Sequence, residues 1–267
     1  MLMGFTLLCL YGVVVASGVV FDSSVIMWVL MEISLYLLIM FMLLNGVNMS
    51  SLVLYYVVQT MGSCFMLWGW LVCPAVGWVG LFLKLGVFPF SVWVLKCVSE
   101  SDKKSVVVLI LGFQKLLPMC FMVKMMLVPG LVVLLSLFSC LFGVFVMLQS
   151  NSFNLLISGS SVMHTSWVVL YFWLDPSLVF VYYGVYILLL MFVVFLNEYK
   201  NGLVLFCLSS VPPLFGFYLK WVIFCNWGVM WLVVLSLFIM CSGLSALGYF
   251  RWLMVYLMES CMSPVVK

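Results

Sequence analysis

The chain has 267 residues, of which 68% are hydrophobic and only 6% are charged (10 Lys or Arg and 7 Asp or Glu). An ordinary soluble domain has about 25% charged residues. With a mean hydropathy of +1.40, the chain has too little charge for a solvated surface, which excludes a soluble protein and indicates an integral membrane protein. The net charge of +3 forms no basic stripe, so we expect no nucleic-acid partner.

The sequence offers few ligands for a redox cofactor. Its ten cysteines are scattered without a C-x-x-C pair, and His164 is the single histidine. A bis-His haem needs two histidines, and the chain has neither a Gly-rich nucleotide loop nor a Walker motif. We therefore expect no cofactor and no metal in this chain, and we expect any redox chemistry to take place on another chain.

The first half of the chain, residues 1–128, is predicted to hold five transmembrane helices. The N-terminal segment has no basic n-region and is long enough to span, so it is interpreted as the first helix. Glu32 lies near the centre of the second span, Lys84 lies one helical turn before Pro89 in the fourth, and Lys115 lies midway along the fifth. The predicted spans are residues 3–20, 25–44, 51–72, 75–97 and 105–127.

The second half, residues 129–267, is predicted to hold five more helices. His164 lies midway along the seventh span, and in the ninth span Pro212 and Pro213 precede Lys220. In both halves the fourth span is the one interrupted by proline. The predicted spans are residues 131–149, 153–173, 177–196, 202–227 and 229–257.

These spans predict a single all-α membrane domain, because a backbone in the bilayer must satisfy its polar groups within helices. A repeat with an odd number of spans reappears upside down, so we expect two inverted five-helix repeats with a broken helix in each, as in many transporters. The alternative is that the prolines only kink their helices.

The loop charges predict the orientation. Ten spans place both termini on one side of the membrane, and Lys124 is the basic residue expected on the other side. By the positive-inside rule, both termini face the matrix or cytoplasm. The basic residues expected on the side of the termini are Lys96, Lys103, Lys104, Lys200, Arg251 and Lys267.

Five ionisable side chains fall inside the predicted spans. A Lys or Glu at the bilayer centre costs about 2.5–3.5 kcal/mol on insertion scales, so such groups face a bundle interior and pair with one another. Each also has a purely structural interpretation: a salt-bridge partner, a snorkelling lysine or a hydrogen-bonded core histidine. The five residues are Glu32, Lys84, Lys115, His164 and Lys220.

This set of groups suits proton exchange better than binding of a divalent metal, which prefers several carboxylates. Desolvation disfavours a charged lysine and a nearby carboxylate favours it. A movement of the carboxylate therefore switches a lysine between holding and releasing a proton. A histidine titrates near neutrality and can relay between such groups.

Several of these segments resemble the antiporter-like subunits of respiratory complex I. WVLMEISL is similar to their glutamate-bearing helix, and FLKLGVFPFSVWV is similar to their Lys-Gly-x-x-Pro-Phe broken helix. LGFQKLLP, SGSSVMHTSW and SSVPPLFGFYLKW resemble segments of the subunit-2 branch of that family, with departures at Phe113, Ser166, Ser210 and Val211. The similarity runs from residue 28 to about residue 252.

The resemblance implies a core membrane subunit that translocates protons, driven by electron transfer from NADH to ubiquinone elsewhere in the complex. It implies that Glu32 and Lys84 form a coupling pair, that Lys115 is the central relay with His164 nearby, and that Lys220 is the terminal lysine. NADH, FMN, iron–sulfur clusters and ubiquinone would be bound by other subunits.

The implied partners are other membrane-arm subunits and lipid, in a hetero-oligomer of the mitochondrial inner membrane. Two alternatives stay open: a stand-alone monovalent cation/proton antiporter, and a structural subunit that does not pump.

Overall fold

The computed structural model describes residues 2–21, 23–123, 129–174, 176–195, 204–205, 207–209, 215–226 and 232–262, and in these ranges it contains helices and no strand. Eight helices in this part of the chain are long and apolar enough to cross a membrane. The predicted all-α membrane fold is therefore confirmed, while the count of ten spans and the inverted repeat stay predictions. The chain divides into two compact units, residues 1–132 and 133–267, and each is described by itself.

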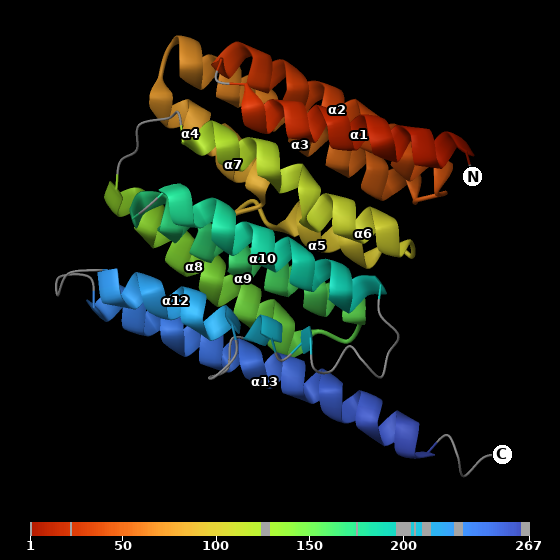
Figure 1. The fold of residues 1–267 in the computed structure, drawn as a ribbon, viewed down its shortest axis with the longest axis vertical. Helices are drawn as coiled ribbons and strands as arrows, with labels where there is room; N and C mark the ends of the chain where they lie inside the picture. Colours follow the sequence, from red (N-terminus) through yellow and green to blue (C-terminus); the bar gives the residue numbers. More distant parts are fainter. Residues whose placement is uncertain are drawn as a thin grey trace. The chain divides into compact units, whose positions relative to one another are not determined.

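The helices of the first unit follow the predicted spans, and the first three begin within two residues of the predicted positions. Local sequence sets several ends. Gly46 adopts a positive φ of 69° just after the second helix, and Pro74 occupies the first turn of the fourth, where its missing N–H has no cost. The helices are α1 (Leu2–Val20), α2 (Ser24–Leu44), α3 (Met49–Leu71), α4 (Pro74–Leu85), α5 (Val92–Ser99), α6 (Lys104–Leu111) and α7 (Leu116–Met122) (Figure 1).

The predicted fourth span is broken, as expected, between α4 and α5. The break begins at Gly86 rather than at Pro89, because Gly86 takes the left-handed conformation with φ +71°. The Gly86 N–H donates to the Leu83 carbonyl (3.3 Å) and the Val87 N–H to the Phe82 carbonyl (3.0 Å), which together form a Schellman motif. Lys84 therefore lies in the last turn of a half-helix.

The predicted fifth span is also interrupted, which the sequence analysis did not anticipate. Between α6 and α7 the chain forms the 3-10 turn η1 (Phe113–Lys115). Pro118 explains its position, because proline has no N–H for the carbonyl four residues earlier, that of Gln114, and its ring clashes with that carbonyl in a regular α-helix. Lys115 is the last residue of this turn.

Glycines allow α3 and α4 to pack at short range, and the two helices lie side by side in Figure 1. A Cβ at Gly80 would lie 2.5 Å from the Gly62 carbonyl oxygen, and a Cβ at Gly69 would lie 2.1 Å from the Gly77 Cα. Small residues at such contacts let backbones approach closely, as in many membrane helix pairs. A Cβ at Gly62 would meet the Lys84 Cγ at 2.8 Å, so this contact also positions the lysine stem.

In the second unit, the described helices again match the predicted spans closely where both can be compared. At the C-terminal end of the sixth span, Arg251 donates to the carbonyls of Leu148 and Ser150. Pro212, Pro213, Lys124, Lys200 and Lys267 lie outside the described residues. The helices are α8 (Pro129–Gln149), α9 (Phe153–Leu174), α10 (Pro176–Phe195), α12 (Phe215–Asn226) and α13 (Leu232–Met262).

Helix α9 is almost completely buried although it carries many hydroxyl groups. These hydroxyls donate to backbone carbonyls one turn earlier on the same helix, as Ser158 does to Leu155 and Thr165 to Val162. Burying a hydroxyl is costly unless it is hydrogen-bonded, and these bonds satisfy the hydroxyls of Ser158, Ser160, Thr165 and Ser166 within α9. The polar composition of α9 is therefore compatible with the interior of the second unit.

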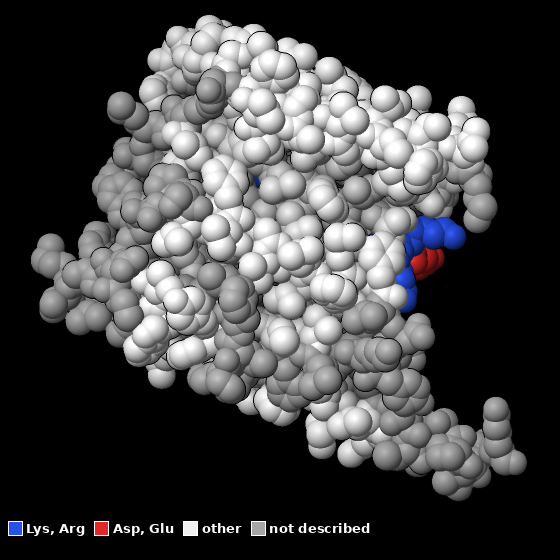
Figure 2. Space-filling view, in the orientation of Figure 1, with Lys and Arg blue, Asp and Glu red and all other residues white. Residues whose placement is uncertain are grey.

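The surface of the described residues matches a membrane environment. Figure 2 shows a face that is almost entirely uncharged, with most of the visible charged side chains gathered in one group at its edge. Glu100, Asp102 and Lys103 lie in the connection between α5 and α6, beside Lys96 and Lys104. Large exposed hydrophobic side chains are found on α1, α2, α3, α8, α10 and α13, as expected for helices that face lipid or other subunits.

Candidate functional site

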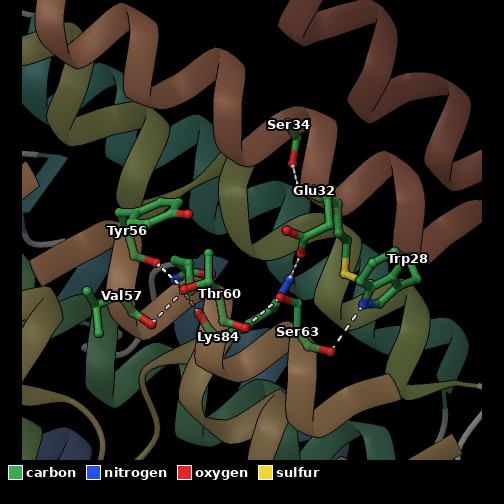
Figure 3. A network of polar contacts seen from close by, with 10 residues as sticks. Trp28, Glu32, Ser34, Tyr56, Val57, Thr60, Ser63 and Lys84 are labelled. Atoms are coloured by element: carbon green, nitrogen blue, oxygen red, sulfur yellow. Dashed lines mark hydrogen bonds and ion pairs between the residues drawn. The ribbon is translucent and has the colours of Figure 1, made fainter. Parts of the chain in front are cut away.

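The first site residue, Lys84, is positioned by the broken helix. Its side chain is only 3% exposed, and its ammonium group lies 3.1 Å from Glu32 Oε1 on α2. The pair is drawn in Figure 3, where the two side chains point toward each other between α2 and α4. Glu32 is 15% exposed. The structure thus brings together two of the five residues singled out in the sequence.

The end of the half-helix favours a positive charge at Lys84. The C-terminus of a helix carries a partial negative charge and free carbonyls. Two of these carbonyls are bound by side chains of the same unit: Trp93 Nε1 donates to the Leu83 oxygen (3.0 Å), and Gln59 Nε2 donates to the Lys84 oxygen (3.5 Å). The dipole and the carboxylate both stabilise the ammonium, whereas burial penalises it.

Helix α3 fixes the surroundings of this ion pair. Trp28 Nε1 on α2 donates to the Ser63 carbonyl on α3 (3.2 Å), while the Ser63 hydroxyl donates to the Thr60 carbonyl (2.7 Å). Figure 3 shows the Trp28–Ser63 bond on the side of the pair away from Tyr56. Gly62 of α3 also lies against the aliphatic part of the Lys84 side chain. Helix α3 therefore contacts both Lys84 and the helix that carries Glu32.

Lys115 lies in the same unit, in η1, with a side chain that is 1% exposed. The preceding residue, Gln114, accepts a hydrogen bond at Oε1 from the Tyr11 hydroxyl on α1 (2.9 Å). The 3-10 turn therefore directs two neighbouring polar side chains into an apolar interior. A mid-helix 3-10 segment often marks a functional position.

His164 lies on α9 in the second unit and contacts two tyrosines of α10. Its Nδ1 is 2.7 Å from the Tyr182 hydroxyl, and its ring centroid is 4.7 Å from that of Tyr186. These three side chains line a small pocket together with Cys207 and Gly216. The pocket places the histidine near Gly216, in the first turn of α12 (Phe215–Asn226).

Lys220 on α12 is 4% exposed and lies over the indole ring of Trp167, with its Nζ 5.0 Å from the ring centroid. Its Nζ has no hydrogen-bond partner among the residues that the structure describes. Trp167 follows His164 by three residues on α9, and Lys220 follows Gly216 by four on α12, so each pair shares one helix face. The lysine therefore lies one helical turn from the pocket that His164 lines.

Sequence reasoning missed the residues that hold these groups. Gln59, Trp93, Trp167 and Tyr182 each contact one of the predicted site residues or its helix end from a different helix, and Tyr11 contacts Gln114 beside Lys115. Aromatic and amide residues at such positions have the spacing of ordinary core residues. The segments quoted for the family resemblance contain Trp93, Trp167 and Gln114, but they did not show what these side chains contact.

The chain is similar to known proteins in sequence and in fold. No protein-family model matches the chain. NADH-ubiquinone oxidoreductase chain 2 of Albinaria caerulea is 24% identical over 262 residues, which cover 89% of this chain and 84% of that protein. The protein of the same name from Mytilus edulis is 29% identical over 228 residues, covering 76% of this chain and 71% of that protein.

Two solved structures share the fold. A chain of respiratory complex I from Thermus thermophilus with bound aureothin superposes with a TM-score of 0.69 at 18% identity, covering 85% of this chain and 64% of that chain. A chain of the membrane-bound sulfane sulfur reductase, an archaeal respiratory membrane complex, gives a TM-score of 0.74 at 18% identity and covers 93% of this chain and 64% of that one. The chain is therefore a homologue of NADH-ubiquinone oxidoreductase chain 2 with the fold of the membrane subunits of respiratory complexes.

Proposed function

We propose that this chain is a membrane subunit of an NADH:ubiquinone oxidoreductase and that it translocates protons through its buried lysines. The names of its relatives support the first part. The observation that carries the second part is the Lys84–Glu32 ion pair at the end of a broken helix. A charged pair is expensive inside a membrane, and such pairs usually mark ion or proton pathways.

The chemistry of the pair follows from its surroundings. Burial penalises the Lys84 ammonium, and the Glu32 carboxylate at 3.1 Å offsets that penalty. When the carboxylate moves away or is protonated, the lysine loses this stabilisation and releases its proton to the nearest acceptor. When the carboxylate returns, the lysine takes up a proton again. Lys115, His164 and Lys220 are the proposed further carriers.

The remaining parts of the proposal concern the assembly. NADH, FMN, iron–sulfur clusters and ubiquinone would be held by other subunits, and this chain would hold none of them. It would lie in the mitochondrial inner membrane as part of a hetero-oligomer, in contact with lipid, with both termini on the matrix side. The uncharged exposed surfaces of its helices support contacts with lipid and with neighbouring membrane subunits.

The test uses the assembled complex reconstituted in liposomes, with NADH oxidation and proton uptake measured together. Lys84→Met and Glu32→Gln should each lower the proton flux through this chain by roughly 100-fold or more, the effect of losing a positioned proton-transfer group. Protons translocated per NADH should then fall by the share that this chain carries. The matched control is Lys96→Met, which removes an exposed lysine of α5 and should leave the ratio unchanged.

Two other outcomes would favour the alternatives. An unchanged proton ratio in both variants, in complexes that assemble normally, would identify a structural subunit that does not pump. An isolated chain that exchanges sodium for protons in liposomes would identify a stand-alone antiporter, and would contradict the proposed membership of a larger complex.

A further inference from the structure

The first and last helices of the second unit, α8 and α13, run parallel to each other. Helix α13 is antiparallel to α9, because Phe153 packs against Trp252 and Trp167 packs against Phe238, with ring centroids 6.2 Å and 5.0 Å apart. Helix α8 is also antiparallel to α9, because only residues 150–152 connect these two helices. Two helices that are both antiparallel to a third are parallel to each other.

A close contact sets the register of α8 against α13. A Cβ at Gly248 would lie 3.3 Å from the Met147 Cβ, so the two helices touch at these residues. Seven positions earlier on each helix stands a cysteine, Cys140 on α8 and Cys241 on α13. Seven residues return to nearly the same face of a helix, within about 20°. Because the helices are parallel, the two cysteines lie at one level of the same interface.

Both cysteines are buried at this interface, and both are free thiols. Cys140 is 0% exposed and Cys241 is 3% exposed. The two thiols hydrogen-bond to each other, which agrees with the register of the helices. The neighbouring residues Ser139, Ser242 and Ser245 on the same helices are buried as well, and side chains this small let membrane helices approach closely.

A pair of contacting thiols can carry out chemistry that a single buried cysteine cannot. A single buried cysteine behaves as a small hydrophobic side chain. Metal binding does not fit this pair, because a structural zinc site takes four ligands and the described residues contain no group of three or more His, Cys, Asp or Glu side chains that could hold a metal. A disulfide needs no further ligand and requires only that the two Cβ atoms approach to about 3.8 Å.

We propose that Cys140 and Cys241 form a redox-active dithiol, which hydrogen peroxide oxidises to a disulfide that joins α8 to α13. The structure shows the reduced state of this pair. The oxidised state adds a covalent bond between the first and last helices of the second unit, and a thiol reductant removes that bond again.

The oxidation proceeds in two steps. One thiol loses its proton and attacks an oxygen of the peroxide, the O–O bond breaks, and a sulfenic acid and one water form. The second thiol attacks the sulfenic sulfur, the S–O bond breaks, and a second water leaves as the S–S bond forms. Two thiols and one peroxide thus give one disulfide and two waters. Burial slows the first step, but the contact between the thiols favours the second step over further oxidation.

An acid-labile bond of the chain makes the disulfide measurable. Asp175 and Pro176 form the only Asp-Pro sequence of the chain, and mild acid cleaves such bonds, which places Cys140 and Cys241 on different fragments. Membranes that contain the chain are treated with hydrogen peroxide, the remaining thiols are alkylated, and the denatured chain is cleaved and run on a gel without reductant. We expect the two fragments to stay joined after peroxide treatment and to separate when dithiothreitol is added.

Two variants and a matched control assign the bond to this pair. Cys140→Ser and Cys241→Ser each remove one partner, so their fragments should separate without reductant after peroxide treatment. Cys207→Ser removes another cysteine of the C-terminal fragment, one that is half-buried, and its fragments should stay joined as in the native chain. The two single variants test the same bond independently, so the failure of one to accumulate leaves the other.

Fragments of the peroxide-treated native chain that separate without reductant would overturn the proposal, and so would fragments that stay joined in Cys140→Ser. Because the readout is a covalent bond within this chain, it does not depend on proton translocation. If Lys84→Met leaves translocation unchanged, the proposed function fails, while the gel still decides whether the two cysteines form a disulfide.

Discussion

His164 Nδ1 and the Tyr182 hydroxyl lie 2.7 Å apart, so these two buried side chains of the second unit share one hydrogen. The contact fixes the ring orientation of the histidine against α10. It also places the other ring nitrogen on the far side of the ring from Tyr182.

Tyr182→Phe tests this contact. The substitution keeps the ring but leaves Nδ1 without its hydroxyl, and an unsatisfied buried polar group costs about 1–3 kcal/mol. We expect a lower melting temperature of the assembled complex, measured by scanning fluorimetry. Tyr36→Phe, at an exposed tyrosine of α2, is the control. A melting temperature equal to that of the control would show that the Tyr182 hydroxyl contributes nothing to the stability of the second unit.

The Glu32–Lys84 pair predicts a non-additive pair of substitutions. Removing one partner of a buried ion pair leaves an uncompensated charge and costs about 3–5 kcal/mol, whereas removing both is less harmful. Glu32→Gln and Lys84→Met should each destabilise the complex more than the double variant does. Melting temperatures of all three complexes provide the double-mutant cycle. Additive effects would mean that the pair is not formed in the assembled protein.

Gly80→Ala tests the contact between α3 and α4. The new methyl group would lie 2.5 Å from the Gly62 carbonyl oxygen and 2.7 Å from the Met66 nitrogen, both backbone atoms. Overpacking of this kind costs about 1–3 kcal/mol, so we expect less of the chain in the assembled complex on native gels. Gly184→Ala is the matched control, because nothing lies within 4 Å of its new methyl group, and assembly should be normal. Equal assembly of the Gly80→Ala and Gly184→Ala variants would contradict the close approach of α3 and α4.

Trp167 predicts a graded series at Lys220. A cation over a desolvated indole is stabilised by about 2 kcal/mol, and less over phenyl. The rate of proton translocation should therefore be highest in the native complex, lower in Trp167→Phe and lowest in Trp167→Leu. Because Trp167 also packs edge-on against Phe238, with centroids 5.0 Å apart, Phe238→Leu serves as the packing control. If Phe238→Leu lowers translocation as much as Trp167→Leu does, packing and not the cation–π contact is responsible.

The sequence predicted the helices well, because nearly every span is an apolar run that ends at a polar or turn-forming residue. The apolar spans placed Glu32 in the second helix and Lys84 in the fourth, the family resemblance implied that they pair, and the structure places the two side chains in contact. Their proposed role, like those of Lys115, His164 and Lys220, stays a prediction.

Other features depend on contacts between helices and carry no sequence signal. Pro118 accounts for the position of the η1 turn, but a proline in a membrane helix often causes only a kink, so it did not by itself predict a 3-10 turn. Gln59 and Trp93 have the spacing of ordinary core residues. Their roles follow only from which carbonyl the neighbouring helix presents, and that depends on the tertiary packing of α3, α4 and α5.

The glycine contact between α3 and α4 limits which part of the ion pair can move. Backbone atoms of Gly62 and Gly80 meet so closely that neither helix can slide or roll on the other without steric overlap, and Lys84 is carried by this two-helix block. Glu32 belongs to α2, which is joined to α3 by side-chain contacts such as the Trp28–Ser63 hydrogen bond. The backbone that carries Lys84 is thus held more tightly than the one that carries Glu32, so a helix movement that separates the two charges is expected in α2 rather than in α4.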